Sequence, residues 1–144
     1  MAYIRRINDR ISVAPQIDPA DVNELASQGF VAVINNRPDN EDAGQPAGDT
    51  VRAAAETLGL AYHAIPVTHA GFSAHQVEAM SAALEAAKGP VLAYCRSGTR
   101  STNLWALAEA SRGEDPQALI EQAAGAGYDI GGIRPLLDQL SGKA

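Results

Sequence analysis

One cysteine and two arginines share a short segment whose residue types are typical of an anion-binding loop. The segment reads Cys95-Arg-Ser-Gly-Thr-Arg-Ser101 and follows the apolar run Pro90–Tyr94. That run predicts a buried strand, and a helix is predicted over 101–111, so the loop lies where open α/β sheets bind ligands. The loop N–H groups and the positive end of the helix would form an anion site. Such a site favours a thiolate, which makes Cys95 a candidate nucleophile.

The other residues of this loop are predicted to bind the substrate. Gly98 permits a backbone conformation that other residues resist, and Arg100, the second predicted catalytic residue, can direct two N–H groups at an anion. Ser101 is placed to donate a hydrogen bond to the sulfur. A lone cysteine after an apolar strand is usually a small core residue, but the glycine and the arginines favour chemistry here. The remaining predicted binding residues of the loop are Arg96, Ser97 and Thr99.

A second polar segment follows the apolar run Phe30–Ile34, and it begins Asn35-Asn36-Arg37-Pro38-Asp39. Carboxyl ends of parallel strands meet at one edge of a sheet, so Arg37 is predicted to help to hold the substrate anion. The alternative is a turn whose charges face water. The histidines do not have metal-ligand spacing, and neither a metal nor a cofactor is expected. Candidate general acids are Asp39, Glu41, Asp42 and His69.

Strand and helix signals alternate along the chain. Alternation of this kind predicts one α/β domain over 1–144, in three layers, with a mainly parallel central sheet flanked by helices. The predicted strands are 3–7, 11–14, 30–34, 60–67 and 90–94. The first predicted helix is capped by Asp18 and ended by Gly29, and the next ones are 50–58, 73–87 with Ser73 as cap, 101–111 and 116–124. A last predicted helix has Ile133, Leu136, Leu137 and Leu140 on one face.

Composition excludes several classes of function. The 144 residues carry a formal net charge of −6, which repels nucleic acid and anionic membranes. With one cysteine there is no intrachain disulfide. No apolar run has the length of a membrane span, and the first residues do not resemble a signal peptide. A reduced cytoplasm is the expected location.

The Cys-x4-Arg loop resembles that of rhodanese-type sulfurtransferases, whereas the order of the central elements is similar to tyrosine and dual-specificity phosphatases. The combination resembles the phosphatase-like domain of beta-lactamase hydrolase-like proteins. This resemblance implies a tyrosine-phosphatase-like fold. It also implies a separate metallo-beta-lactamase-like persulfide dioxygenase as a partner. The segments that carry the resemblance are Gly29–Asp39, Ile65–Val67, Leu92–Ser101 and Ala126–Asp129.

Three departures from the phosphatase pattern favour sulfur transfer. Four residues separate Cys95 from Arg100, whereas protein phosphatases of this fold have five. Tyr94 precedes the cysteine, where these phosphatases usually have histidine. Between His63 and Val77 there is no aspartate to act as the general acid, and the lack of a proton donor costs an alkoxide leaving group ~10²–10⁴ in rate. Sulfite and thiolates leave without a proton.

The first hypothesis is therefore a sulfurtransferase. In it, Cys95 takes sulfane sulfur from thiosulfate or glutathione persulfide and passes it to a thiol or to cyanide. One alternative is a phosphatase that forms a phosphocysteine. The other is a non-catalytic module that binds an anion or a phosphopeptide.

Overall fold

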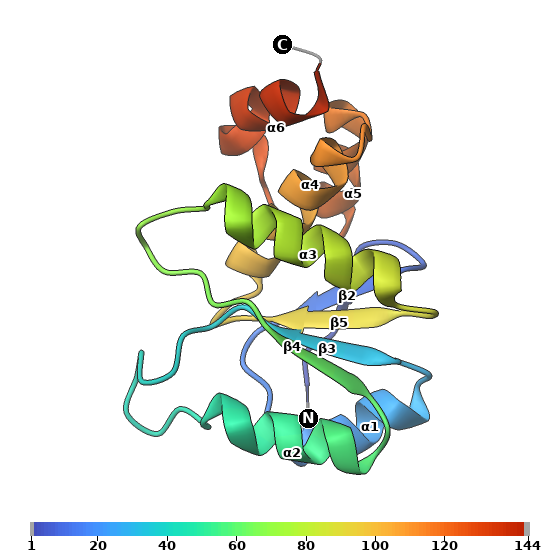
Figure 1. The fold of residues 1–144 in the computed structure, drawn as a ribbon, viewed down its shortest axis with the longest axis vertical. Coiled ribbons are helices and arrows are strands. Elements are labelled where there is room, and N and C mark those ends of the chain that lie inside the picture. Colours follow the sequence, from blue (N-terminus) through green and yellow to red (C-terminus); the bar gives the residue numbers. More distant parts are fainter. Residues whose placement is uncertain (1, 143–144) are drawn as a thin grey trace.

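A computed structural model describes residues 2–142 and folds them around a central sheet (Figure 1). The sheet has five strands in the order β1-β2-β5-β3-β4. β1 pairs antiparallel with β2, and the other neighbours are parallel. The predicted α/β fold with a mainly parallel sheet is confirmed. The strands are β1 Arg5–Arg6, β2 Ile11–Ala14, β3 Ala32–Asn35, β4 Ala61–Ala64 and β5 Val91–Tyr94.

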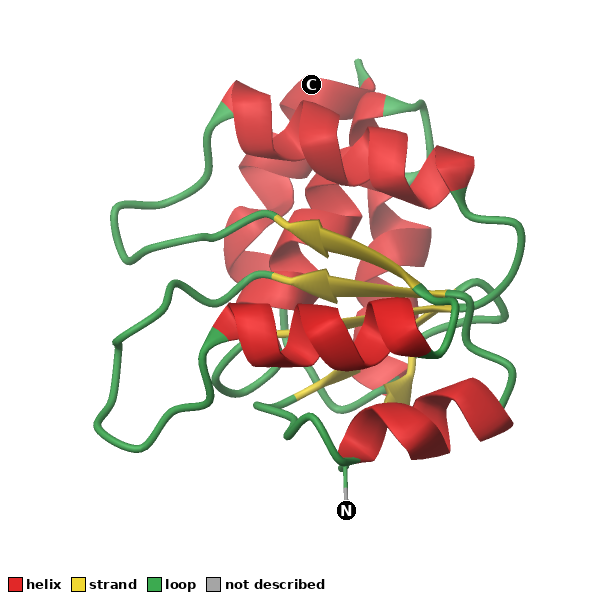
Figure 2. Cartoon of the chain, turned by 60° about the horizontal axis from the view of Figure 1, so that its bottom comes forward, coloured by secondary structure: helices red, strands yellow, loops and turns green. Residues whose placement is uncertain are grey.

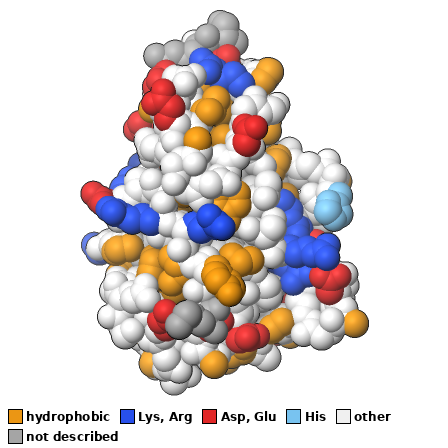
Figure 3. Space-filling view, turned by 180° about the vertical axis from the view of Figure 1, so that it is seen from behind, with side chains coloured by type: hydrophobic (Ala, Val, Ile, Leu, Met, Phe, Trp, Pro, Cys, Tyr) orange, Lys and Arg blue, Asp and Glu red, His pale blue; other side chains and the backbone are white. Residues whose placement is uncertain are grey.

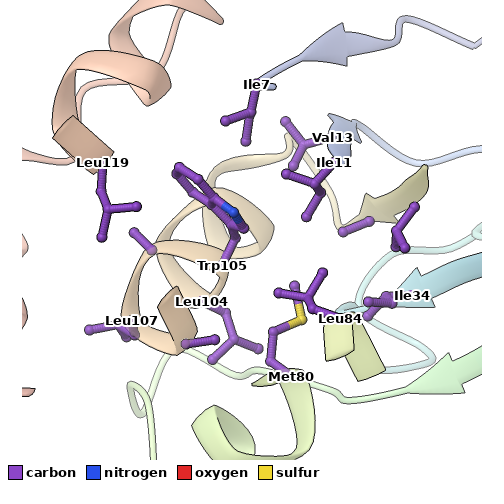
Figure 4. Packing of buried hydrophobic residues seen from close by; sticks show 14 of the residues in the cluster. Ile7, Ile11, Val13, Ile34, Met80, Leu84, Leu104, Trp105, Leu107 and Leu119 are labelled. Atoms are coloured by element: carbon purple, nitrogen blue, oxygen red, sulfur yellow. The ribbon is translucent and has the colours of Figure 1, made fainter. Parts of the chain in front are cut away.

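Helices cover both faces of the sheet and form the outer layers (Figure 1). One face carries two helices, which pack through a cluster that includes Val22 and Val51. The opposite face carries four helices around Met80 and Trp105 (Figure 4). The first pair is α1 Asp21–Ser27 and α2 Gly48–Thr57; the others are α3 Ala74–Ala86, α4 Thr99–Ser111, α5 Pro116–Gly125 and α6 Arg134–Ser141, with the short 3-10 helix Gly131–Ile133 before α6.

β5 is the strand that carries the cysteine loop, and it is buried on both faces. Leu92 and Tyr94 join the cluster under α1 and α2, while Val91 and Ala93 join the cluster under α3 and α4. Successive side chains of a strand point to opposite faces, so an uninterrupted apolar run satisfies both. β5 therefore ends at a position that is fixed by packing from above and below.

Several predicted boundaries were wrong. Asp18 does not cap α1: the backbone N–H of Asp21 donates to its carbonyl in a turn, and the helix begins only after that turn. β4 ends at Ala64, earlier than predicted, and Pro66 beyond it has no N–H for a ladder. α4 starts earlier than predicted, directly after Gly98.

The carboxyl ends of β3, β4 and β5 meet at one edge of the sheet. Two long loops, 36–47 and 65–73, leave this edge, as Figure 2 shows. The loop between β5 and α4 leaves the same edge next to the loop 36–47, because β5 pairs with β3. Within residues 2–142, no helix is long and apolar enough to cross a membrane.

Candidate active site

Cys95 directly follows β5, in the loop that precedes α4. Its side chain is buried, with 0% of its surface exposed. The backbone N–H of Gly98 donates a hydrogen bond to Cys95 Sγ over 3.1 Å. Gly98 has φ +94°, a left-handed conformation that glycine adopts without strain. The loop therefore directs a backbone donor at the sulfur.

The outer side of the loop faces solvent. Ser97 and Thr99 are exposed, and their hydroxyl oxygens lie 3.0 Å apart. The side chain of Arg96 is 66% exposed. The N-cap residue Gly98 has no side chain to cap α4, and the Thr99 N–H donates to Ser97 Oγ over 3.4 Å, so the helix N-terminus adds positive potential behind the loop. Direct substrate contact by these three side chains stays a prediction.

Arg100 joins the cysteine loop to the loop after β3. Its two terminal nitrogens donate to the two carboxylate oxygens of Glu41 over 2.7 and 2.9 Å. One of them also donates to the Val67 carbonyl over 2.6 Å. The Glu41 hydrogen bond raises the pKa of Arg100, and the nearby Cys95 sulfur raises it further. Arg100 is thus a permanent cation beside the sulfur.

Glu41 is ionised in this arrangement, which contradicts its prediction as a general acid. Arg37 Nε donates to the same carboxylate over 2.8 Å. The hydrogen bond from Arg100, joined by that from Arg37, lowers the pKa of Glu41 from 4.5 to about 2, against the effect of burial. A carboxylate held by two guanidinium groups accepts hydrogen bonds and has no proton to give.

Arg37, which was predicted to help to hold the substrate anion, instead donates to Glu41 and positions it. Its side chain is 4% exposed, and its other two nitrogens donate to Asp42 over 2.6 Å and to Gln16 over 3.0 Å. With all three nitrogens engaged, we assign Arg37 to holding the loop after β3. Asp42 Oδ2 also lies 3.3 Å from Arg96 Nε. On the molecular surface, basic and acidic side chains lie next to one another (Figure 3).

The remaining predicted acids lie elsewhere. Asp39 Oδ1 accepts a hydrogen bond from the backbone N–H of Gly48 over 2.8 Å, so Asp39 holds the start of α2. His69 is exposed in the loop 65–73. That loop contains no aspartate or glutamate. His69 as a proton donor stays a prediction.

Ser101 does not donate to the sulfur, contrary to the prediction. Its hydroxyl donates to Asn36 Oδ1 over 2.8 Å, and Asn36 Nδ2 donates to the Ile65 carbonyl over 2.9 Å. A serine hydroxyl has one proton, and this bond uses it. Both side chains are 0% exposed. Ser101 therefore ties α4 to the ends of β3 and β4.

Tyr128 is a site residue that sequence reasoning missed. It follows α5, and its hydroxyl donates to the Ser97 carbonyl over 3.0 Å. A Cβ atom at Gly98 would lie 2.2 Å from that hydroxyl oxygen. Burial raises the pKa of Tyr128, so its hydroxyl is neutral at ordinary pH. In the sequence, an aromatic residue between two predicted helices is typical of a packing residue. The one signal for Tyr128 was its place in Ala126–Asp129, a segment that carries the family resemblance.

Residues 2–142 contain no cluster of three or more His, Cys, Asp or Glu side chains that could hold a metal ion. The site that the structure assembles consists of a thiol, a backbone donor and a paired arginine. These groups suit nucleophilic attack on a small oxyanion, in which the cation and the N–H stabilise developing negative charge.

Comparisons with known proteins agree with this fold. The chain is 39% identical to the beta-lactamase hydrolase-like protein of Agrobacterium fabrum over 116 residues, which are 81% of this chain and 27% of that relative. A candidate phosphatase of Neisseria meningitidis has a solved structure with TM-score 0.82 and 33% identity, covering 95% of this chain and 97% of that one. TpbA of P. aeruginosa, at 20% identity and TM-score 0.64, covering 96% and 88%, shares the fold.

The chain spans 27% to 29% of the length of the curated relatives it matches. The family model of the beta-lactamase hydrolase-like protein, phosphatase-like domain, matches residues 3–112. This range includes Cys95, Arg100 and Glu41 and ends before Tyr128. The chain belongs to the family of the beta-lactamase hydrolase-like protein, phosphatase-like domain.

Proposed function

We propose that the domain is a cysteine-dependent sulfurtransferase. The Cys95 thiolate attacks the outer sulfur of thiosulfate, a new S–S bond forms, and the S–S bond of the donor breaks to release sulfite. An external thiolate then attacks the outer sulfur of the Cys95 persulfide. This second step forms a new persulfide and returns the Cys95 thiolate, so atoms and electrons balance. Glutathione persulfide is the alternative donor, and its leaving group is the glutathione thiolate.

The observation that carries this proposal is the state of the carboxylates around the cysteine. Glu41 is held ionised by two arginines, and Asp39 holds the start of α2. Sulfite and thiolates are stable anions, so sulfur transfer proceeds without a proton donor. An alkyl phosphate needs such a donor, and its loss costs ~10²–10⁴ in rate.

The groups around Cys95 also suit a persulfide intermediate. The Gly98 N–H already donates to Sγ, and Arg100 supplies the cation beside it. Cys95 is the only cysteine of the sequence, so the acceptor thiol must come from outside these 144 residues. Under this proposal, a metallo-beta-lactamase-like persulfide dioxygenase would consume the persulfide product.

Phosphate ester hydrolysis is the second candidate, and the comparisons favour it over sulfur transfer. The matching family is described as phosphatase-like, and the relative from Neisseria meningitidis is a candidate phosphatase at 33% identity. In this reaction the Cys95 thiolate attacks phosphorus, the P–O bond breaks to release an alkoxide or phenoxide, and water then hydrolyses the phosphocysteine to phosphate and the thiolate. Among residues 2–142, no protonated carboxyl group is placed to give the leaving group a proton. We therefore expect aryl phosphates to react and alkyl phosphates to be poor substrates.

Parallel turnover assays on the purified chain test the proposal. Wild type is given thiosulfate with cyanide, and thiocyanate is measured; p-nitrophenyl phosphate is given separately, and nitrophenol is measured. The proposal expects thiocyanate formation that Cys95→Ser abolishes while the thermal unfolding curve of the variant matches wild type. Nitrophenol release that depends on Cys95, without thiocyanate formation, would establish the phosphatase. Turnover of none of these substrates, with anion affinity kept in Cys95→Ser, would leave a binding module.

A further inference from the structure

One peptide unit of the cysteine loop is held at both ends. The unit joins Ser97 to Gly98. At one end, the Tyr128 hydroxyl donates to the Ser97 carbonyl oxygen over 3.0 Å. At the other end, the Gly98 N–H donates to Cys95 Sγ over 3.1 Å.

A peptide unit is planar and trans, so its carbonyl and its N–H point in opposite directions. Any force that fixes the carbonyl therefore fixes the N–H. Rotation of the Ser97–Gly98 unit by half a turn would remove the N–H from the sulfur and place a carbonyl oxygen there instead. A carbonyl dipole repels a thiolate, whereas an N–H stabilises it. Glycine on one side makes this rotation accessible, because Gly98 adopts either sign of φ readily.

Tyr128 is built into a support that keeps its hydroxyl in place. The guanidinium carbon of Arg5 lies 5.9 Å from the centre of the Tyr128 ring, and Arg5 Nη1 donates to the Ala126 carbonyl over 3.3 Å. Gly98 completes the contact, since a Cβ atom there would lie 2.2 Å from the tyrosine oxygen. The first strand of the chain and the segment after α5 thus meet over the cysteine loop.

We propose that Tyr128 is a positioning residue for Cys95: its hydroxyl holds the Ser97–Gly98 peptide so that the N–H faces the sulfur. Tyr128 acts through the backbone of the loop. The proposal rests on the proposed function only in that Cys95 is the reacting group, and it applies equally to sulfur and to phosphoryl transfer. Tyr128 lies outside the matched range 3–112, so the family match does not assign it a role.

The rate of Cys95 alkylation by iodoacetamide, measured against pH, tests this role without any substrate. Tyr128→Phe keeps the ring over Gly98 and removes only the hydroxyl. The matched control is Tyr62→Phe, which removes a hydroxyl that accepts from Asn35 Nδ2 at the edge strand β4. We expect the alkylation rate of Tyr128→Phe at neutral pH to fall about fivefold, the factor of one net hydrogen bond, with the profile displaced to higher pH.

A superimposable pH profile for wild type and Tyr128→Phe would overturn the proposal. An equal displacement in Tyr62→Phe would do the same, because it would show a general effect of hydroxyl loss. Turnover separates this result from the fate of the proposed function. If wild type transfers neither sulfur nor phosphate while the alkylation profile still shifts, then the proposed function fails and the role of Tyr128 stands.

Discussion

Two walls enclose the cysteine loop, and they are built from different interactions. The ionic wall consists of Arg100, Glu41, Arg37 and Asp42, and it comes from the loop after β3 and the start of α4. The tyrosine wall consists of Tyr128 against Gly98, and it comes from the segment after α5. The ionic wall holds a side-chain cation beside the sulfur. The tyrosine wall holds a backbone N–H on the sulfur.

The environment of the Cys95 thiol is therefore set by two kinds of interaction, ion pairs on one side and a neutral hydrogen bond on the other. Charge pairs lose strength with protonation and with salt, whereas a neutral hydrogen bond depends little on either. Glu41 is 18% exposed and Arg100 15% exposed, so their attraction is only partly screened. We therefore expect the charge of the site to depend on conditions and the backbone geometry of the loop to stay constant.

The largest expected effect comes from the cation of the ionic wall. Arg100 binds Glu41 through two nitrogens and the Val67 carbonyl through one of them. A lysine ammonium cannot reproduce this planar fork. We expect Arg100→Lys to lower kcat/KM by about 100-fold in whichever of the two turnover assays wild type supports. A loss below about threefold would show that the fork is not needed.

Removing the charge of Glu41 should have a smaller effect. Glu41→Gln keeps an acceptor for one guanidinium but leaves Arg100 and Arg37 without their shared anion. We expect kcat to fall about tenfold with little change in KM, because the cation loses its orientation. The control is Asp49→Asn, which makes the same charge change in an exposed pair with Arg52. Equal losses in both variants would show a general charge effect.

The pH dependence of stability should separate the walls. The pKa of Glu41 is lowered from 4.5 to about 2, so its stabilisation is fully present above pH 4.5 and is lost as the pH falls towards 2. The difference in unfolding free energy between wild type and Glu41→Gln should therefore shrink across that window. The difference between wild type and Tyr128→Phe should stay constant there, because the phenol is protonated throughout. Urea unfolding at several pH values measures both differences in unfolding free energy. If the difference for Glu41→Gln stayed as constant with pH as that for Tyr128→Phe, the distinction between the two walls would be contradicted.

The smallest effect is expected at the exposed rim. Arg96 is 66% exposed and lies 3.3 Å from Asp42. Exposed ion pairs contribute about 0–1 kcal/mol, so Arg96→Ala should change the unfolding free energy by less than about 0.5 kcal/mol. A destabilisation of about 2 kcal/mol or more in urea unfolding would place Arg96 within the ionic wall.

Sequence reasoning found the parts of the site that local patterns encode. An apolar run followed by cysteine, glycine and a helix predicts a strand–loop–helix unit, and β5 and α4 form it around Gly98. The pairing of Arg100 with Glu41 spans 59 positions, and the contact of Tyr128 with Ser97 spans 31. Neither spacing reflects a helical or strand period, so only the packed fold brings these residues together. Ser101 was misassigned because its partner Asn36 lies on another loop. Arg37 was misassigned because Glu41 and Asp42 of its own loop bind its nitrogens.

Intact-protein mass spectrometry tests the central claim, that Cys95 is a sulfur carrier, most directly. Wild type and Cys95→Ser are incubated briefly with thiosulfate, with glutathione persulfide and, separately, with an aryl phosphate, and are then quenched in acid. We expect wild type to gain the mass of one sulfur atom, a reductant to remove it, and Cys95→Ser to gain nothing. A gain of one phosphoryl group from the aryl phosphate, with no sulfur gained from either donor, would show that Cys95 is not a sulfur carrier and would establish a phosphocysteine.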